Sequence, residues 1–189
     1  MAARRRISMA ELPTALAADR DAAFPHLVRA LMDGIYSGAL RLTGSHSDAE
    51  DVAQEAFLRA YRALGTYEAA RIRELRLREW VWAIAANLCR NRARSARRRP
   101  EAPLHPDAPV PDPAPGPEAE AVAAVGNECL AAHLARLPWA QRSAVVLRHV
   151  GGLSYAEVAA ALDRPVGTVK ADVHRGLQHL RTALEEEQA

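Results

Sequence analysis

Three stretches before residue 100 carry apolar residues at every third or fourth position, which is the period of an amphipathic helix. The apolar positions of the first stretch are Leu27, Leu31, Ile35, Ala39 and Leu42, and this helix is expected to end near Gly44. Those of the second are Val52, Ala53, Ala56, Phe57, Ala60 and Leu64. The third runs from about residue 79 to 97, with core positions Trp80, Val81, Ile84, Ala85 and Leu88. No useful length of chain alternates as a β-strand does, so a compact helical bundle is predicted.

Capping signals refine this pattern. Ser47, followed three residues later by Glu50, has the spacing of a capping box and is expected to open the second helix. Further helices are predicted near 119–136, 138–150, 154–162 and 166–184. Pro138 suits the first turn of its helix, Gly151-Gly152 closes that helix, and Ser154 begins a second capping box.

A tight turn is predicted between the last two helices. Asp163-Arg164-Pro165 separates helix 154–162 from the helix that starts at 166, and Pro165 is pre-set to begin the second of them. Two helices joined in this way form a helix-turn-helix, whose second helix can enter a major groove.

Proline marks the boundary between the two halves. Eight of the twelve prolines lie between Pro100 and Pro117, where neither a helix nor a central strand can form. The predicted fold is all-α, with two small helical domains joined by a Pro-rich linker. We expect a flexible N-terminal arm at 1–19, a first domain at 20–99, an acidic linker at 100–118 and a second domain with the helix-turn-helix at 119–189.

The net charge of +2 hides a segregation of charge along the chain. Between residues 71 and 99, ten arginines stand against two glutamates, a local net charge of +8. Between 101 and 128 there are six acidic residues and no Lys or Arg, a local net charge of −6. Lys170 is the single lysine, so the basic segment presents guanidinium forks, which suit phosphate.

Several classes of protein are not favoured by this sequence. It lacks a run of about 18 apolar residues and an apolar N-terminal signal, so no membrane insertion is expected and a cytoplasmic location is favoured. Cys89 and Cys129 lack zinc-ligand spacing, and two buried thiols are the simpler interpretation. No metal and no cofactor are expected.

The helix that begins at residue 166 carries the candidate DNA-reading face. Its outward residues are Thr168, Ala171, Asp172, Arg175, Gln178 and His179, with Lys170 and His174 at the margin. Arg175 suits guanine or a phosphate, Gln178 suits adenine, and Ala171 suits a thymine methyl group. A solvated helix face is the alternative interpretation.

A second candidate lies on the third helix. Arg90, Arg94 and Arg97 form a stripe opposite its core side, flanked by Asn87 and Trp82. Such a stripe fits a nucleic-acid backbone, and an exposed Trp82 could stack on an unpaired base. Packing of Trp82 over the edge of the core is the equally weighted alternative.

Taken together, these segments resemble the extracytoplasmic-function (ECF) group of bacterial RNA polymerase sigma factors. The resemblance rests on SDAEDVAQEAFLRAYRA, WVWAIAANLCRNRARSARRR and LPWAQRSAVVLRHVGGLSYAEVAAALDRPVGTVKADVHRGLQHLR. It covers the chain from Phe24 to Leu184 except the linker. It implies a helical domain two at 20–99 and a helix-turn-helix domain four at 119–189.

The resemblance also implies partners and residue roles. Core RNA polymerase, through its β′ clamp helices and β flap, promoter DNA and an anti-sigma factor are the implied partners. The implied docking residues for the clamp helices are Asp51, Gln54, Glu55 and Leu58. For the minus-10 element they are Tyr67 in a base-capturing loop at 65–74, then Asn87, Arg90, Arg94 and Arg97, and the stacking hypothesis above adds Trp82 to this set. For the minus-35 element they are Thr168, Lys170, Ala171, Asp172, His174, Arg175 and Gln178.

Two features depart from the family pattern. The loop EAARIRELRLREW is rich in Arg and poor in Gly, and Asp172 stands where the family often carries Arg. An outward carboxylate at 172 is expected to repel phosphates, or else to accept a hydrogen bond from cytosine.

Two other classes remain as alternatives. A LuxR-type regulator shares the helix-turn-helix but needs a receiver or ligand pocket in its first half. An enzyme such as a recombinase needs a nucleophile among catalytic partners, and Ser8, Ser37, Ser45 and Ser47 have none in evidence. The sequence therefore predicts a promoter-specificity subunit that is not an enzyme.

Overall fold

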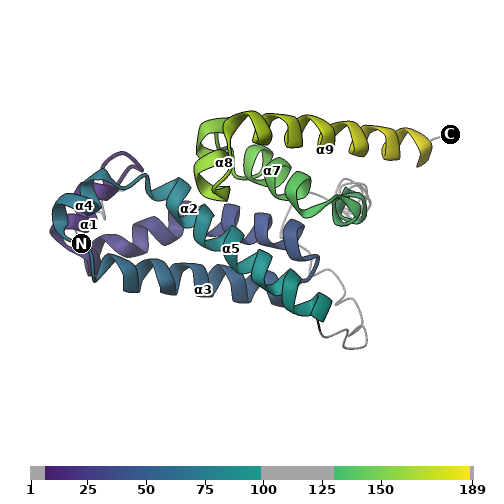
Figure 1. The fold of residues 1–189 in the computed structure, drawn as a ribbon. Coiled ribbons are helices and arrows are strands. Elements are labelled where there is room, and N and C mark those ends of the chain that lie inside the picture. The colour runs from purple at the N-terminus through teal and green to yellow at the C-terminus, as the bar shows by residue number, and fades with distance from the viewer. Residues whose placement is uncertain (1–6, 99–129, 188–189) are drawn as a thin grey trace, which may run out of the picture.

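The computed structural model describes residues 7–98 and 130–187, and all regular structure in these two ranges is helical. The first range holds α1 (Leu12–Ala18), α2 (Arg20–Thr43), α3 (His46–Leu64), α4 (Ala69–Glu74) and α5 (Leu77–Arg98). The second holds a helical stretch at 130–136, then α7 (Trp139–His149), α8 (Tyr155–Leu162) and α9 (Val166–Glu187). Figure 1 shows the two groups of helices as two domains placed side by side. The predicted all-α fold is confirmed.

The long helices α2 and α3 form the centre of the first domain, and both have clear ends. Asp19 caps α2 by accepting a hydrogen bond from the amide of Ala22 at 3.0 Å. Gly44, at φ 76°, closes α2 in the left-handed conformation that favours glycine. Ser45 caps α3 by accepting from the amide of Asp48 at 3.2 Å. The capping box expected from Ser47 is therefore wrong by two residues, because Ser45 also has an acidic residue three positions later.

The N-terminal arm is not free from residue 12 onward. Leu12 and Leu16 are 0% and 2% exposed, and α1 packs against α2 and α4. Pro13 sits at the start of α1, where its missing N–H removes no helical hydrogen bond. The expected flexible arm is wrong for this segment, because two leucines one turn apart are enough to anchor a short helix on the bundle.

The helix-turn-helix of the second domain is confirmed. Ser154 and Glu157 exchange the two hydrogen bonds of a capping box at the start of α8. Asp163 ends α8 in the left-handed region at φ 52°, and Pro165 leads into α9. The turn therefore lies at Asp163-Arg164-Pro165, as predicted.

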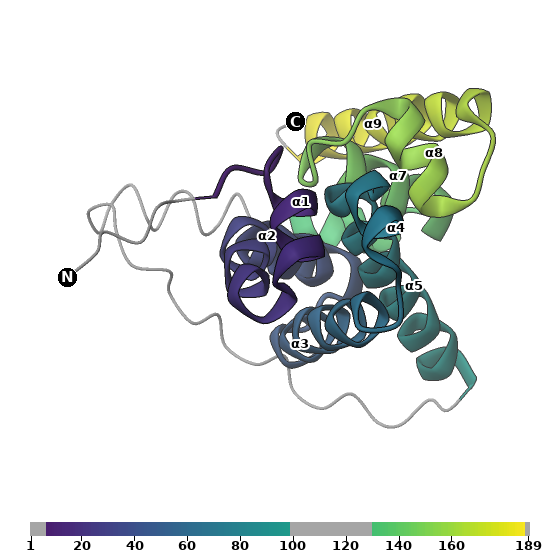
Figure 2. The same ribbon diagram turned by 90° about the vertical axis from the view of Figure 1, so that its left-hand side faces the viewer.

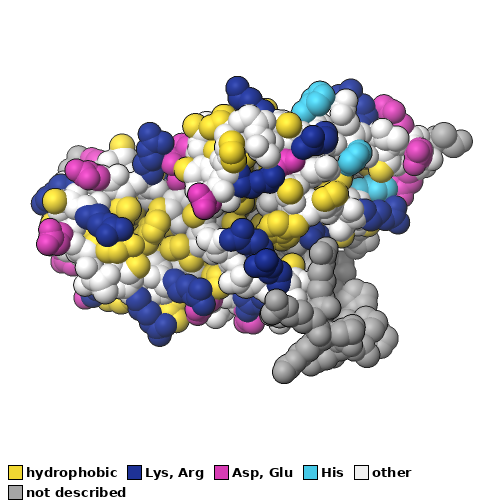
Figure 3. All heavy atoms as spheres, viewed as in Figure 1, with side chains coloured by type: hydrophobic (Ala, Val, Ile, Leu, Met, Phe, Trp, Pro, Cys, Tyr) yellow, Lys and Arg dark blue, Asp and Glu magenta, His cyan; other side chains and the backbone are white. Residues whose placement is uncertain are grey.

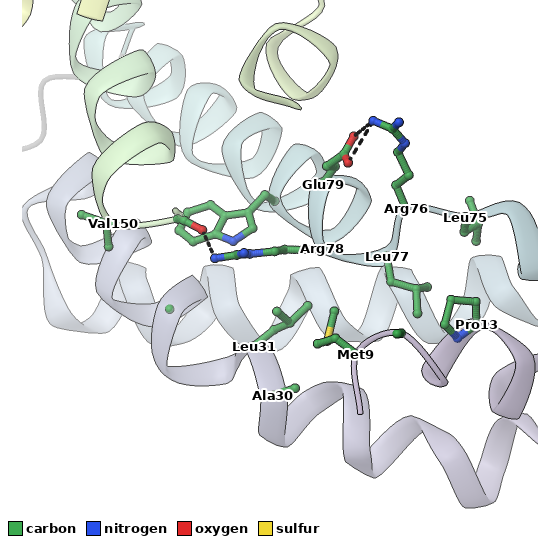
Figure 4. Close-up of a pocket in the computed structure, with 14 residues that line it drawn as sticks. Met9, Pro13, Ala30, Leu31, Leu75, Arg76, Leu77, Arg78, Glu79 and Val150 are labelled. Atoms are coloured by element: carbon green, nitrogen blue, oxygen red, sulfur yellow. Dashed lines mark hydrogen bonds and ion pairs between the residues drawn. The ribbon is translucent and has the colours of Figure 1, made fainter. Parts of the chain in front are cut away.

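The two domains pack directly against each other through α5. Helix α8 and the turn after α7 lie against α5, while α7 also contacts α2 (Figures 1 and 2). The indole of Trp82 is only 3% exposed and lies between Gly38 of α2 and Gly151 of that turn. Beside it, Arg78 donates a hydrogen bond to the carbonyl of Gly151 at 2.5 Å (Figure 4). The hypothesis that Trp82 is exposed and stacks on a base is therefore wrong for this arrangement, because the indole is buried between the two domains.

Carboxyl groups also meet across this contact. Glu79 of α5 forms a hydrogen bond with Glu157 of α8 and an ion pair with the exposed Arg76 at 3.3 Å. Burial and then the neighbouring Glu157 raise the pKa of Glu79, although Arg76 opposes the shift. The pKa of Glu157 is lowered, first by the amide of Ser154 that binds its carboxylate. A proton on Glu79 therefore favours the contact between the two domains.

Gly38 and Gly34 provide a matched test of the Trp82 contact. A Cβ at Gly38 would overlap the indole ring, whereas a Cβ at Gly34 would lie 3.7 Å from it in ordinary contact. We expect Gly34→Ala to be neutral or stabilising by up to about 1 kcal/mol through helix propensity. Gly38→Ala is expected to destabilise by about 1–3 kcal/mol through overpacking. Thermal unfolding of both variants checks this, and equal melting temperatures would contradict it.

Glu79→Gln tests the carboxyl pair. The stability that protonated Glu79 contributes is fully present below its ordinary pKa of 4.5 and is lost as the pH rises through its raised pKa. Gln donates the same hydrogen bond without needing a proton, so the variant should gain stability over the wild type as the pH rises above 4.5. Thermal unfolding at pH 4.5 and 7.5 measures this gain. A difference between the proteins that does not change with pH would rule out the shared proton.

Candidate DNA and polymerase interfaces

The outward face of α9 carries most of the predicted minus-35 residues. Lys170, His174, Arg175 and Gln178 are exposed, and Thr168 and Ala171 are half-buried. The opposite side of the helix is anchored in the core by Val169, Val173 and Leu180, which are at most 7% exposed. Figure 3 shows Lys, Arg and His side chains gathered over this domain. The structure therefore presents to solvent a polar helix face whose cations are Lys170 and Arg175, even with the two domains in contact.

Asp172 does not belong to this exposed face. It is 3% exposed, and its two carboxylate oxygens lie 2.6 Å from Arg164 Nη1 and 2.9 Å from Arg175 Nη2. The expectation of an outward carboxylate is wrong, because Arg164 of the preceding turn supplies a partner that the helical spacing of α9 does not reveal. A buried carboxylate paired with two arginines neither repels phosphates freely nor reaches a cytosine.

Side chains of α7 and α8 border the reading face. The Tyr155 ring lies beneath two cations, with Arg148 Cζ at 5.1 Å and Lys170 Nζ at 5.8 Å from the ring centroid. His179, expected to point outward, is exposed but pairs with Gln141 of α7 at 3.0 Å. These contacts hold the margins of α9 in place.

The predicted base-capturing segment contains a short helix. Helix α4 occupies Ala69–Glu74, and its residue Arg71 places Cζ 4.1 Å from the centroid of the half-buried Tyr67 ring. The ring of Trp80 lies 6.1 Å away from that of Tyr67. Tyr67 is thus an aromatic platform with a cation on one side, an arrangement that the pattern of the sequence did not indicate.

The later turns of α5 carry the predicted arginine stripe. Asn87, Arg90 and Arg94 are exposed, and Arg90 donates to the amide oxygen of Asn87 at 2.5 Å. The side chain of Arg97 lies outside the described residues. Trp82 is separated from this group by its burial between the domains.

The third surface lies on α3. Asp51, Gln54 and Leu58 are exposed and Glu55 is half-buried, opposite the core side of the helix. Leu58, at 42% exposed, is one of the few large apolar side chains left in solvent. Arg59 binds Glu55 at 2.6 Å, and that hydrogen bond lowers the pKa of the Glu55 carboxyl. The predicted docking residues therefore share one face that combines acidic groups with a leucine.

Arg92 is a residue that the sequence pattern missed. It joins α5 to the acidic edge of α3, with Nε 3.2 Å from Asp48 and Nη2 3.1 Å from Asp51. Its side chain is half-buried, whereas those of Arg90 and Arg94 are exposed. Both predicted docking carboxylates are therefore already paired within the domain, Asp51 with Arg92 and Glu55 with Arg59.

Other functional chemistry finds little support in the described ranges. Burial raises the pKa of the Cys89 thiol to about 12, which keeps it protonated and unreactive. Cys129 lies outside the described residues. Within 7–98 and 130–187, no cluster of His, Cys, Asp or Glu could hold a metal ion. No helix in those ranges is long and apolar enough to span a membrane.

Comparison with known proteins places the chain in a family. Residues 27–99 match Sigma-70 region 2, and residues 127–180 match Sigma-70, region 4. The chain is 32% identical over 178 residues to the ECF RNA polymerase sigma factor SigW of Bacillus subtilis (strain 168), covering 88% of this chain and 90% of that protein. It is 31% identical over 176 residues to the RNA polymerase sigma-H factor of Pseudomonas aeruginosa, covering 86% of each.

A solved structure gives the same fold. The sigma factor RpoE of Bartonella quintana, in complex with the anti-sigma factor NepR, matches with a TM-score of 0.65 and 22% identity, over 86% of this chain and 96% of that one. The two family matches fall on the two helical domains, and the second includes the helix-turn-helix. The protein therefore belongs to the ECF group of RNA polymerase sigma factors, the subunits that direct promoter-specific transcription initiation.

Proposed function

We propose that the three surfaces divide the work of promoter recognition. The face of α9 takes the minus-35 element, the 65–74 segment with the arginine stripe of α5 takes the minus-10 element, and the face of α3 docks on core polymerase. The observation that carries the proposal is the exposed polar face of α9, with Lys170 and Arg175 as its cations, on the second helix of a helix-turn-helix, the element that can enter a major groove.

The minus-10 assignment rests on an aromatic ring next to a cationic helix. Tyr67 with Arg71 offers stacking and charge to an unpaired base, and Asn87, Arg90 and Arg94 offer donors to the adjoining backbone. A base captured only after it leaves the duplex shifts DNA toward the melted state without ATP. Trp82 joins this set only when the domains are apart.

The proposal places the protein in the cytoplasm with polymerase and assigns it no catalytic step of its own. An anti-sigma factor is the proposed regulator, since the similar fold of RpoE from Bartonella quintana was solved with one. The match of the first domain to Sigma-70 region 2 leaves a LuxR-type regulator without support.

Reconstituted transcription tests the function. The pure protein with core polymerase should select a limited set of promoters from a random library and start transcripts there. Neither component should do so alone. Selective transcription without the protein, or DNA cleavage by the protein alone, would contradict the proposal.

Charge reversal tests the α3 docking face. Asp51→Arg together with Glu55→Arg should weaken binding to core polymerase, because an acidic face suits a basic helical partner and both residues lie outside the core. The loss should exceed tenfold, or about 1.4 kcal/mol. Binding is measured by titration of labelled protein with core polymerase.

Glu50→Arg is the matched control for this test. Glu50 is exposed on the same helix but lies to one side of the docking face. Helical circular dichroism should be normal in both variants. Equal affinities for the control and the double variant would remove α3 as the docking surface.

A further inference from the structure

One buried carboxylate ties the recognition helix to the turn that precedes it. Asp172 Oδ2 lies 2.6 Å from Nη1 of Arg164, and Asp172 Oδ1 lies 2.9 Å from Nη2 of Arg175. Arg164 belongs to the turn between α8 and α9, while Arg175 lies on α9, one helical turn after Asp172. Two guanidinium groups from different elements are thus gathered at one anion.

Both arginines still reach solvent although their anchor does not. The side chains of Arg164 and Arg175 are 29% and 54% exposed, whereas that of Asp172 is 5% exposed. Each guanidinium has five N–H donors, so pairing through one nitrogen leaves others for a further acceptor. The carboxylate cancels one of the two positive charges and leaves the group cationic. Such an arrangement fits an anionic ligand with several acceptor oxygens, which is the chemistry of a phosphate.

We propose that Arg164 contacts a DNA phosphate and that Asp172 is a positioning residue, which holds the guanidinium groups of Arg164 and Arg175 side by side at the DNA. The inference rests on the proposed function, because it requires α9 to face minus-35 DNA. Arg164 lies in the turn before the recognition helix. In a helix-turn-helix, the first helix crosses the DNA backbone while the second helix enters the groove, so this turn lies near the phosphates. A phosphate contact there fixes how α9 enters the groove and leaves base reading to α9 itself.

A purely repulsive Asp172 makes the opposite prediction. Removing a carboxylate that only repels DNA strengthens binding, since the DNA then meets one negative charge fewer. Removing a carboxylate that positions two arginines weakens binding, although the same charge is lost. The sign of the change for Asp172→Asn therefore separates the two roles.

The experiment uses full-length protein in complex with core polymerase. Promoter DNA is selected from a random library by the wild-type holoenzyme, and its affinity is measured at several salt concentrations and across minus-35 variants. Arg164→Ala should reduce the slope of log affinity against log salt by about 0.9, equally for all minus-35 sequences. Arg136→Ala, which removes an exposed arginine outside the helix-turn-helix, is the matched control and should leave the slope unchanged.

Asp172→Asn should weaken binding severalfold, and its effect should be coupled to that of Arg164→Ala in a double-mutant cycle. If Asp172→Asn does not fold, the cycle between Arg164→Ala and Arg175→Ala replaces it, and coupled losses support the shared anchor. Tighter binding by Asp172→Asn, additive losses, or an Arg164→Ala slope equal to the control overturns the proposal. If the wild-type holoenzyme enriches no sequence, the proposed function fails and this inference falls with it.

Discussion

The indole of Trp82 packs against two glycines whose positions leave no room for a Cβ. Gly38 on one side and Gly151 on the other allow the ring to reach the backbone of α2 and of the turn after α7. Truncating a buried aromatic side chain to alanine typically costs about 3–5 kcal/mol, and at Trp82 this loss is shared between its own domain and the contact with the second domain. Helix α5 is therefore covered by its own domain on one side and by the second domain on another. This contact decides which surfaces of the two domains are covered and which remain exposed to a partner.

Helices that bury one face were predicted correctly from the sequence. The prediction failed for residues that are buried by a segment distant in the sequence. The stripes of α2 and α3 face one core, so their period identifies them. Leu12 and Leu16 are too few to show a period, and α4 is a single short helix held by its neighbours. For α5, the predicted core residues Val81, Ala85 and Leu88 are buried, but Trp80 and Ile84 are only half-buried. Trp82 and Ala86, which were not predicted as core, are buried as well. A helix covered on two sides has no single apolar stripe, and the sequence of one domain does not reveal the other.

The same reason explains the difference at Asp172. Helical spacing alone assigned this residue to the outward face of α9, whereas the structure turns its side chain inward. Its orientation is decided by Arg164, which belongs to a turn and has no place in a helical period. Asp172 and Arg164 were both visible in the sequence, but only the geometry of the turn brings them within 2.6 Å. The sequence predicted the exposure of most candidate residues on the helix faces, whereas a cluster assembled from a turn and a helix required the structure.

The contact between the domains also sets a condition on DNA binding. The face of α9 is exposed while the domains are packed, and so are Asn87, Arg90 and Arg94 of α5, so neither surface needs the contact to break. Trp82 and the first turns of α5 are covered, and a single indole cannot line the slot and stack on a base at the same time. A ligand that uses this end of α5 therefore binds the separated form and shifts the equilibrium only by its difference in affinity for the two forms. The minus-35 role proposed for α9 carries no such condition. With the proposed minus-10 role of this end of α5, the free energy of the Trp82 contact must be offset by the new contacts that form at that element.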